Sequence, residues 1–290
     1  MKIGFELETI LECQPCNGIG EYHSGESVDE LPTIAGRSFL AEHDSSICNG
    51  SDEYACEFVS PKFAFNSDNI LKMKTALDAI HNCFGARVNR SCGTHISVSM
   101  PSMNHREFRQ FYYLARMFQQ GFYASTGSIT RQENSYAEPI RNLPYCGETG
   151  VDEGCYSRNT HRTSWLNTTN IDKTNKVTGR NDRCEFRIFS GTLEPKKLIA
   201  WSQLATCFSL WASDTELQTN PVVPYLNDTQ YGEGRFQLDC LLDTLGWLDN
   251  TNNNWVENDV LSIKDGVNVL QTLADKYDAK MYDERQGYIL

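Results

Sequence analysis

The chain has 290 residues and carries 26 Lys and Arg against 38 Asp and Glu, a formal net charge of −12. With 40% hydrophobic and 11% aromatic residues it is too apolar for a disordered polyanion, and it is long enough for one large or two modest globular domains. It has no apolar run of the roughly 20 residues that span a bilayer, and its acidity argues against the basic face of a generic nucleic-acid binder. We therefore expect no membrane segment and no generic nucleic-acid binding. Charges in the first eight residues are unlike a signal peptide, which predicts a cytoplasmic protein.

The first half of the chain alternates predicted strands and helices. Residues 2–10 alternate between apolar and polar side chains, which is typical of a half-buried strand. Residues 13–36 are rich in Gly, Pro, Glu and Ser and predict a long loop, and strand-like patterns follow at 37–47 and 54–60.

Two helices and a further strand follow. Asn66 or Ser67 can cap a helix that ends at Gly85. The stretch 87–100 is strand-like, and a second amphipathic helix is predicted at about 106–123.

The second half begins with a polar stretch, 125–182, that is longer than an ordinary connection and predicts a functional loop. A strand at 184–189 and a strongly apolar helix to about residue 212 come next. Two amphipathic helices are predicted near 235–245 and 259–280. Short strands mixed with helices, without Gly-rich strand–helix turns, favour an α+β fold. We expect a catalytic domain over 1–215 and a helical extension over 216–290 that packs on it.

Eleven cysteines, an odd number, argue against a disulfide framework. Those in apolar periodic segments are predicted to be small buried side chains: Cys83, Cys184, Cys207 and Cys240. Cys13 and Cys16 have the C-x-x-C spacing of a metal site, but no second such pair follows. A zinc site that joins them to Cys146 and Cys155 is the alternative to a loop with free thiols, which we favour.

Strand parity gathers charged side chains on one side of the predicted sheet. In each of four strands the polar residues alternate with residues that face the core. If these strands are neighbours, one face carries Glu6, Glu8, Glu57, His95, Glu185 and Arg187.

Four carboxylates on one surface would repel each other unless a cation neutralises them. A set of carboxylates with one imidazole suits Mg²⁺ or Mn²⁺ better than zinc, and carboxylate-bound Mg²⁺ often takes phosphate oxygens, which points to nucleotide chemistry. Arg187 could then meet charge on a transferring phosphoryl group. The P-loop and protein-kinase motifs are absent. The alternative interpretation is a solvated strand face with a structural histidine.

Five segments in order resemble a known family. They are G-F-E-L-E at 4–8, H-D-S-S at 43–46, E-F-V-S-P at 57–61, C-G-T-H-I-S-V at 92–98 and E-F-R-I-F-S-G-T-L-E at 185–194. This series resembles the amidoligases of the glutamine synthetase/glutamate–cysteine ligase superfamily, which are often encoded by phages and bacteria, over about residues 1–210. For a phage-encoded protein the compartment would be the host cytoplasm.

The resemblance implies a curved, mainly antiparallel sheet of glutamine synthetase-like type with helices on its outer face. It implies an ATP-dependent carboxylate–amine ligase that forms an amide through an acyl phosphate. The substrates would be a small-molecule carboxylate and an amine, either amino acids or peptides. Two or more Mg²⁺ (or Mn²⁺) ions would be held by Glu6, Glu8, Glu57 and Glu185.

The resemblance also assigns roles. Glu6 and Glu185 would bind the metal near the transferring phosphate, and Glu8 and Glu57 the metal on the substrate side. His95 would contact nucleotide phosphate or metal, Arg187 the γ-phosphate, and Asp44 the acceptor amine. The substrate or the phosphates would also be contacted by Arg131, Arg162 and Asn167.

One departure from the family pattern is Ser97, where members often have a second histidine; it affects the nucleotide contact and not the carboxylates. Two alternatives stay open: a metal-dependent phosphohydrolase or nuclease, which also uses carboxylate clusters, and a non-catalytic interaction module. The superfamily also contains guanidino kinases, so formation of ADP alone would not demonstrate ligation.

Overall fold

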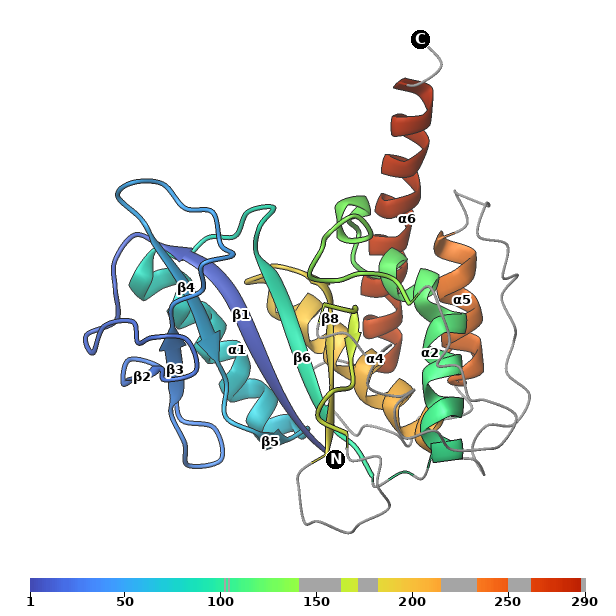
Figure 1. The fold of residues 1–290 in the computed structure, drawn as a ribbon, viewed down its shortest axis with the longest axis horizontal. Coiled ribbons are helices and arrows are strands. Elements are labelled where there is room, and N and C mark those ends of the chain that lie inside the picture. Colours follow the sequence, from blue (N-terminus) through green and yellow to red (C-terminus); the bar gives the residue numbers. More distant parts are fainter. Residues whose placement is uncertain are drawn as a thin grey trace.

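The computed structural model describes residues 1–101, 103, 105–140, 163–171, 182–214, 234–249 and 262–287. Within these ranges a single eight-stranded sheet forms in the order β2-β3-β4-β1-β6-β8-β7, with β5 paired to β1. Every strand pair in it is antiparallel. With helices on one side, the fold is α+β with an open, curved antiparallel sheet (Figure 1). None of the described helices has the length and apolar character needed to cross a bilayer.

The centre of the sheet is β1 (Lys2–Leu11), flanked by β4 (Tyr54–Val59) and β6 (Gly93–Ser99). Beyond β6 lie β8 (Arg183–Ser190) and the two-residue β7 (Leu166–Asn167). On the other side β3 (Phe39–Glu42) and β2 (Glu26–Val28) form the edge, and β5 (Phe63–Ala64) pairs with the start of β1. The central strands are therefore the ones predicted to carry the charged side chains.

Helices α1 (Ser67–Phe84) and α4 (Pro195–Ser213) lie behind the sheet in Figure 1, and α2 (His105–Ala124), α5 (Gly234–Thr244) and α6 (Ile263–Gly287) stack beside them. A short 3₁₀ turn, η1 (Ile129–Arg131), follows α2. The helices leave the opposite face of the sheet open for a site.

The boundaries of α1 follow from local chemistry. The side chain of Asn66 accepts a hydrogen bond from the backbone N–H of Asn69 at 3.1 Å, which satisfies an otherwise unpaired donor of the first turn. Gly85 ends the helix with a φ of 58°, a left-handed conformation that glycine adopts without a steric penalty. Ile70, Met73 and Leu77 are buried and fix the helix against the sheet.

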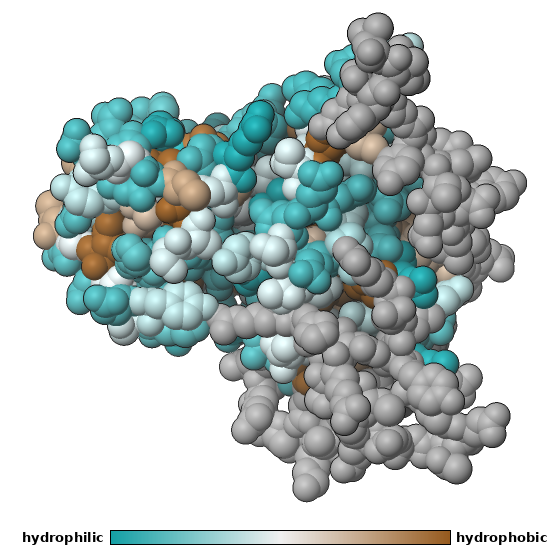
Figure 2. Space-filling model, turned by 45° about the horizontal axis from the view of Figure 1, so that its top comes forward, coloured by the Kyte–Doolittle hydropathy of each residue, from teal (hydrophilic) through white to brown (hydrophobic). Residues whose placement is uncertain are grey.

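The core lies between sheet and helices. Phe5 of β1 packs edge-on against Phe63, and Phe122 of α2 packs against Phe186 of β8 with ring centroids 5.6 Å apart. Most residues of α4 are buried, because this helix is covered by the sheet on one side and by α2 and α6 on others. On the face shown in Figure 2 the coloured surface is mostly hydrophilic, with scattered hydrophobic residues.

Some expectations need correction. The predicted loop 13–36 contains the edge strand β2, and the polar stretch 125–182 contains η1 and β7. Strands β2 and β7 have only three and two residues, which is too short for a periodic pattern in the sequence. They form because they pair with neighbouring strands. Cys83 is exposed and not buried, because it lies on the outer side of α1.

Cys184, Cys207 and Cys240 are buried as predicted. The other two cysteines of the considered zinc site, Cys146 and Cys155, lie outside the described residues. The tail helices pack on the rest of the chain: α5 contacts α2, and α6 contacts α4.

Candidate active site

The open face of the sheet brings the predicted charged residues together. In the register of the sheet Glu8 lies opposite Glu57 of β4, and Glu6 lies opposite His95 of β6. Glu185 of β8 lies opposite Ser97, one step along β6 from the histidine. The condition set by strand parity, that these strands be neighbours, is thus met.

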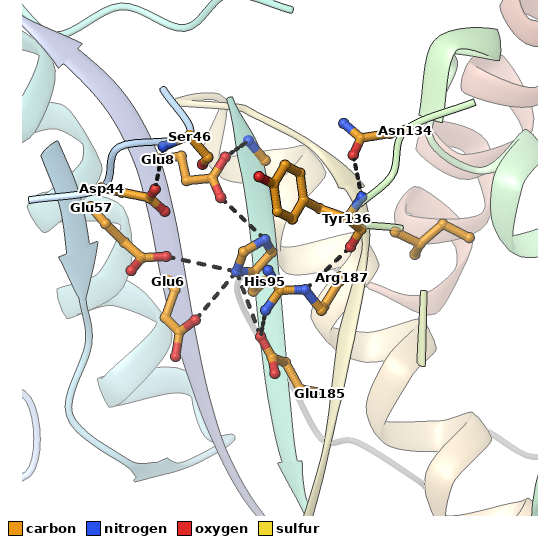
Figure 3. Close-up of polar contacts among 12 residues, drawn as sticks. Glu6, Glu8, Asp44, Ser46, Glu57, His95, Asn134, Tyr136, Glu185 and Arg187 are labelled. Atoms are coloured by element: carbon orange, nitrogen blue, oxygen red, sulfur yellow. Dashed lines mark hydrogen bonds and ion pairs between the residues drawn. The ribbon is translucent and has the colours of Figure 1, made fainter. Parts of the chain in front are cut away.

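His95 is at the centre of the cluster, as Figure 3 shows. Its Nδ1 atom lies 3.3 Å from Glu6, 3.7 Å from Glu57 and 3.6 Å from Glu185. Its Nε2 atom lies 3.3 Å from Glu8. The imidazole is buried, so one side chain is shared by four carboxylates from three other strands.

These contacts shift the protonation of the cluster. Burial favours the neutral imidazole, but the hydrogen bond to Glu6 and the charge of Glu8 raise the pKa of His95 to about 9. Burial opposes ionisation of Glu6, yet its contact with His95 lowers the pKa of that carboxyl below its ordinary value. Burial and the neighbouring charge of Glu6 raise the pKa of Glu57 to about 8. Four carboxylates thus share the two cations His95 and Arg187, and the raised pKa keeps Glu57 largely protonated at neutral pH.

Glu185 has two further partners. Arg187 donates from Nη1 to Glu185 at 2.8 Å, and its Nε donates to the carbonyl of Tyr136 at 3.3 Å. Asn167 of β7 donates from Nδ2 to the other carboxylate oxygen at 2.7 Å. Strand β7, a two-residue element, therefore has a role at the site: it holds Asn167 beside Glu185.

A bulge in β8 shapes this part of the site. Thr94 of β6 pairs with Phe189 and Ile96 with Phe186, so β8 has one extra residue opposite His95. Arg131 is buried and donates to the carbonyls of Arg187 and Ile188, at 2.6 and 3.0 Å. Arg131 thus satisfies carbonyls in the bulged segment and supports the backbone that carries Arg187. It does not line either cleft described below.

Gly93 makes the close approach of strands possible. Its N–H donates to Glu8. A Cβ atom at this position would lie 3.2 Å from side-chain atoms of Arg131, Glu8 and His95, which is tighter than ordinary contact. A side chain at residue 93 would therefore push on the centre of the cluster.

Asp44 lies at the edge of the cluster, just past the end of β3, where its carboxylate accepts a hydrogen bond from the N–H of Ser46 at 2.7 Å. Arg162, the remaining predicted site residue, lies outside the described residues. Two site residues were missed: Glu42, a buried carboxylate opposite Glu57 in the register, and Arg183, two residues before Glu185. Parity could have found both.

Two clefts meet over this face. The larger, of about 430 Å³, is lined by Glu6, Glu57, Glu185, His95 and Asn167 among others. The second, of about 400 Å³, is lined by His43, Ser45, Ser46 and Tyr136 among others. Both are bordered by Tyr22, Asp44 and Arg187, so these three residues lie where the clefts join. Two polar compartments that share a border suit a reaction between two substrates.

The donor set fits divalent cations. Ligand atoms of Glu6, Glu57 and His95 lie within 4.8 Å of one another, and so do those of Glu8, Asp44 and Glu57. Glu57 belongs to both groups, so it could bridge two ions. Oxygen-rich sets of this kind match magnesium or manganese.

The sequence was compared with protein-family models. The model of a family described as "Putative amidoligase enzyme" matches residues 2–209. The chain belongs to this amidoligase family. The match covers β1 through most of α4 and so includes every predicted site residue, whereas α5 and α6 lie beyond it.

Comparison with solved structures finds the crystal structure of the complex between the prokaryotic ubiquitin-like protein Pup and its ligase PafA, with 8% sequence identity and a TM-score of 0.41. The alignment covers 98% of this amidoligase but only 65% of that chain. No curated protein matches the sequence.

Proposed function

We propose that this amidoligase joins a carboxylate to an amine with ATP as the energy source and with two or more Mg²⁺ (or Mn²⁺) ions. The observation that carries the proposal is His95 surrounded by four carboxylates at 3.3–3.7 Å on the open face of the sheet. In an amidoligase, such a surplus of buried carboxylates is best explained by cations that arrive with the nucleotide.

Glu6, Glu57 and His95 would hold one ion, and Glu8, Asp44 and Glu57 a second, with Glu185 completing the set on the phosphate side. When bound, such ions shield phosphate charge from an approaching carboxylate. Asn167 fixes Glu185 through its 2.7 Å hydrogen bond, so the orientation of this carboxylate does not depend on a ligand.

Arg187 is placed to neutralise a phosphoryl group. Its guanidinium has one hydrogen bond to Glu185 and one to a backbone carbonyl, which leaves further donors for phosphate oxygens. Because Arg187 borders both clefts, a group held by it lies between the two substrates.

The reaction balances without other reactants. An oxygen of the substrate carboxylate attacks the γ-phosphorus of ATP, ADP leaves, and an acyl phosphate results. The amine then attacks the acyl carbon, inorganic phosphate leaves, and the amine gives up a proton. Asp44, at the junction of the clefts, would accept that proton or orient the amine.

The clefts have the volume of small-molecule sites, so we propose a small acid and an amine, each an amino acid or part of a peptide. The test is ADP formation with ATP and Mg²⁺ over a panel of acids and amines. Release of ADP that requires both substrates, with a new amide detected by mass spectrometry, is expected. The same ADP rate without any amine would indicate a kinase or phosphohydrolase instead.

Two variants test the proposed metal ligands. Glu6→Gln and Glu185→Gln should each lower turnover by about 10²–10³-fold while the thermal midpoint stays near that of the parent protein. The matched control is Glu53→Gln, a half-buried carboxylate outside both clefts whose partner is Arg87, beside the end of β1. Full activity of both site variants would remove the metal-ligand assignment.

A further inference from the structure

The face of the sheet that carries the carboxylates becomes basic at its other end. Lys2 has the same strand parity as Glu6 in β1, since the two are four residues apart. Arg183 likewise shares the parity of Glu185 in β8. Lys62, just before β5, lies beside the start of β1. Lys2 and Lys62 have no role in the proposed ligase chemistry, and Arg183 lies between the two regions, since it lines both the main cleft and this end of the face.

These side chains line one small depression. Ile3 and Gly4 line it together with six polar or charged residues: Lys2, Lys62, Ser97, Ser99, Asp182 and Arg183. The three cations face a single carboxylate there, that of Asp182. None of the three forms an ion pair with a carboxylate of the described chain. In a protein with a net charge of −12, positive charges gathered without carboxylate partners call for another explanation.

Two further observations favour an anion at this place. The Nε atom of Arg183 is buried and has no hydrogen-bond partner among the described residues, which is costly for a charged donor. Burial and the nearby charges of Arg183, Arg37 and Lys2 lower the pKa of Lys62. The cations therefore repel each other, as the carboxylates do at the other end.

Size limits what can bind. The depression has a volume of about 30 Å³, against about 430 Å³ for the main cleft. It can take one small group but not a nucleoside or a whole amino acid. Hydroxyl groups of Ser97 and Ser99 add hydrogen-bond donors to the cations, and Gly4, without a side chain, leaves the strand backbone open between them.

The depression borders the proposed active site. Arg183 lines both it and the main cleft. Along β1 the distance from Lys2 to Glu6 is about 13 Å, at about 3.3 Å per residue. A molecule whose reactive end lies at the carboxylate cluster could therefore place a second, remote group in the depression.

We propose that this depression, formed by Lys2, Lys62, Arg183, Ser97 and Ser99, is a binding site for an oxyanion group of a substrate. The group is either a phosphate of ATP remote from the transferred one or a second carboxylate of the acid substrate. The assignment to a substrate rests on the proposed ligase function, whereas binding of an anion at this place does not.

Anion binding is tested first in metal-free protein with EDTA, so that the carboxylate cluster cannot recruit the probe through Mg²⁺. Pyrophosphate and malonate are titrated by calorimetry as phosphate and carboxylate probes. The parent protein should bind at least one of them, and Lys2→Gln and Lys62→Gln should each weaken binding about tenfold. Lys62→Arg should retain it.

The matched control is Lys74→Gln, which removes the same charge from an exposed position of α1. It should leave both affinities unchanged. Both site lysines are exposed, so the variants are expected to fold, and their thermal midpoints verify this. Absence of binding to the parent protein, or equal binding by a folded double variant Lys2→Gln/Lys62→Gln, would overturn the proposal.

The source of the anion is identified with Mg²⁺ present. A tenfold higher Kd for MgATP in the lysine variants assigns the depression to a nucleotide phosphate. An unchanged Kd for MgATP with a tenfold higher KM for the acid assigns it to a substrate carboxylate. If the parent protein binds no MgATP at all, the proposed ligase function fails, but the EDTA experiment still decides whether the anion site exists.

Discussion

The two ends of one sheet face carry opposite charge although the same strands form both. Glu6 and Glu185 lie at one end, whereas Lys2 and Arg183 precede them by four and two residues in the same two strands. At the acidic end the side chains are mostly buried and converge on His95. At the basic end the two lysines are exposed and line an open depression.

This difference in burial determines how strongly the charges at each end interact. Buried charges of one sign cost more free energy than exposed ones, because water screens them less. Changes at the acidic end should therefore have large effects on turnover, and a change at Glu57 should also alter stability. Changes at the basic end should alter affinity alone.

The largest effect is expected from Glu57→Gln, because Glu57 belongs to both groups of ligand atoms. Turnover should fall by about 10²–10³-fold, and Mg²⁺ should no longer raise the thermal midpoint. In EDTA at pH 8, however, the variant should be the more stable protein, with a midpoint about 2–4 °C higher.

The sign of the stability change follows from the raised pKa of Glu57, about 8 against 4.5 for the ordinary carboxyl. Between these values the folded state binds the proton more tightly than the unfolded state, so this group destabilises the metal-free fold as the pH rises. Glutamine removes that dependence. Scanning calorimetry from pH 5 to about 8 measures it, and an equal loss of stability in variant and parent would contradict the explanation.

An intermediate effect is expected from Gly93→Ala. The added Cβ would lie 3.2 Å from atoms of Glu8, His95 and Arg131, so the cluster must shift by a few tenths of an ångström. Turnover should fall by up to about 10²-fold while the protein stays folded. Gly4→Ala at the basic end is the matched comparison, since its nearest contact would be an ordinary 3.7 Å. Equal turnover of the two variants would show that the side chains around Gly93 can move apart without loss of activity, which would contradict the prediction.

The smallest effect is expected from salt. Raising the ionic strength to about 0.5 M should weaken pyrophosphate binding to the metal-free protein several-fold, because the exposed lysines are screened. Over the same range the Mg²⁺-induced rise in the thermal midpoint should change less, since its ligands are mostly buried. If salt changed the Mg²⁺-induced rise in the thermal midpoint more than the affinity for pyrophosphate, the proposed contrast between the two ends would be wrong.

Local sequence patterns predicted the strands and helices that bear the site. Parity in β1 placed Glu6 and Glu8 on one face, and the helix α1 begins and ends at the capping residues Asn66 and Gly85. These features depend on neighbours two to four residues away, so the sequence order contains the information. The membership in the amidoligase family followed from the order of such motifs.

Other features depend on distant partners. Parity sets the face of Glu42, which was missed, but it lies opposite Glu57 only because β3 pairs with β4. Asn167, which the resemblance assigned to the site, reaches Glu185 because a two-residue strand pairs with β8. The buried position of Arg131 follows from a bulge that no local pattern marks. The resemblance alone assigned Arg131 to contact with substrate or phosphate. In the structure it contacts backbone carbonyls.

The sequence by itself determined which face of each strand is charged, because side chains alternate along an extended backbone. Tertiary structure decided the order β4-β1-β6-β8, which brings four carboxylates within 3.7 Å of one imidazole and three cations into a separate depression. Strand order is set by burial of the apolar face against α1, α2 and α4, a property of the whole chain. Acidic and basic side chains are therefore separated along one face of the sheet, which the net charge of −12 alone does not reveal.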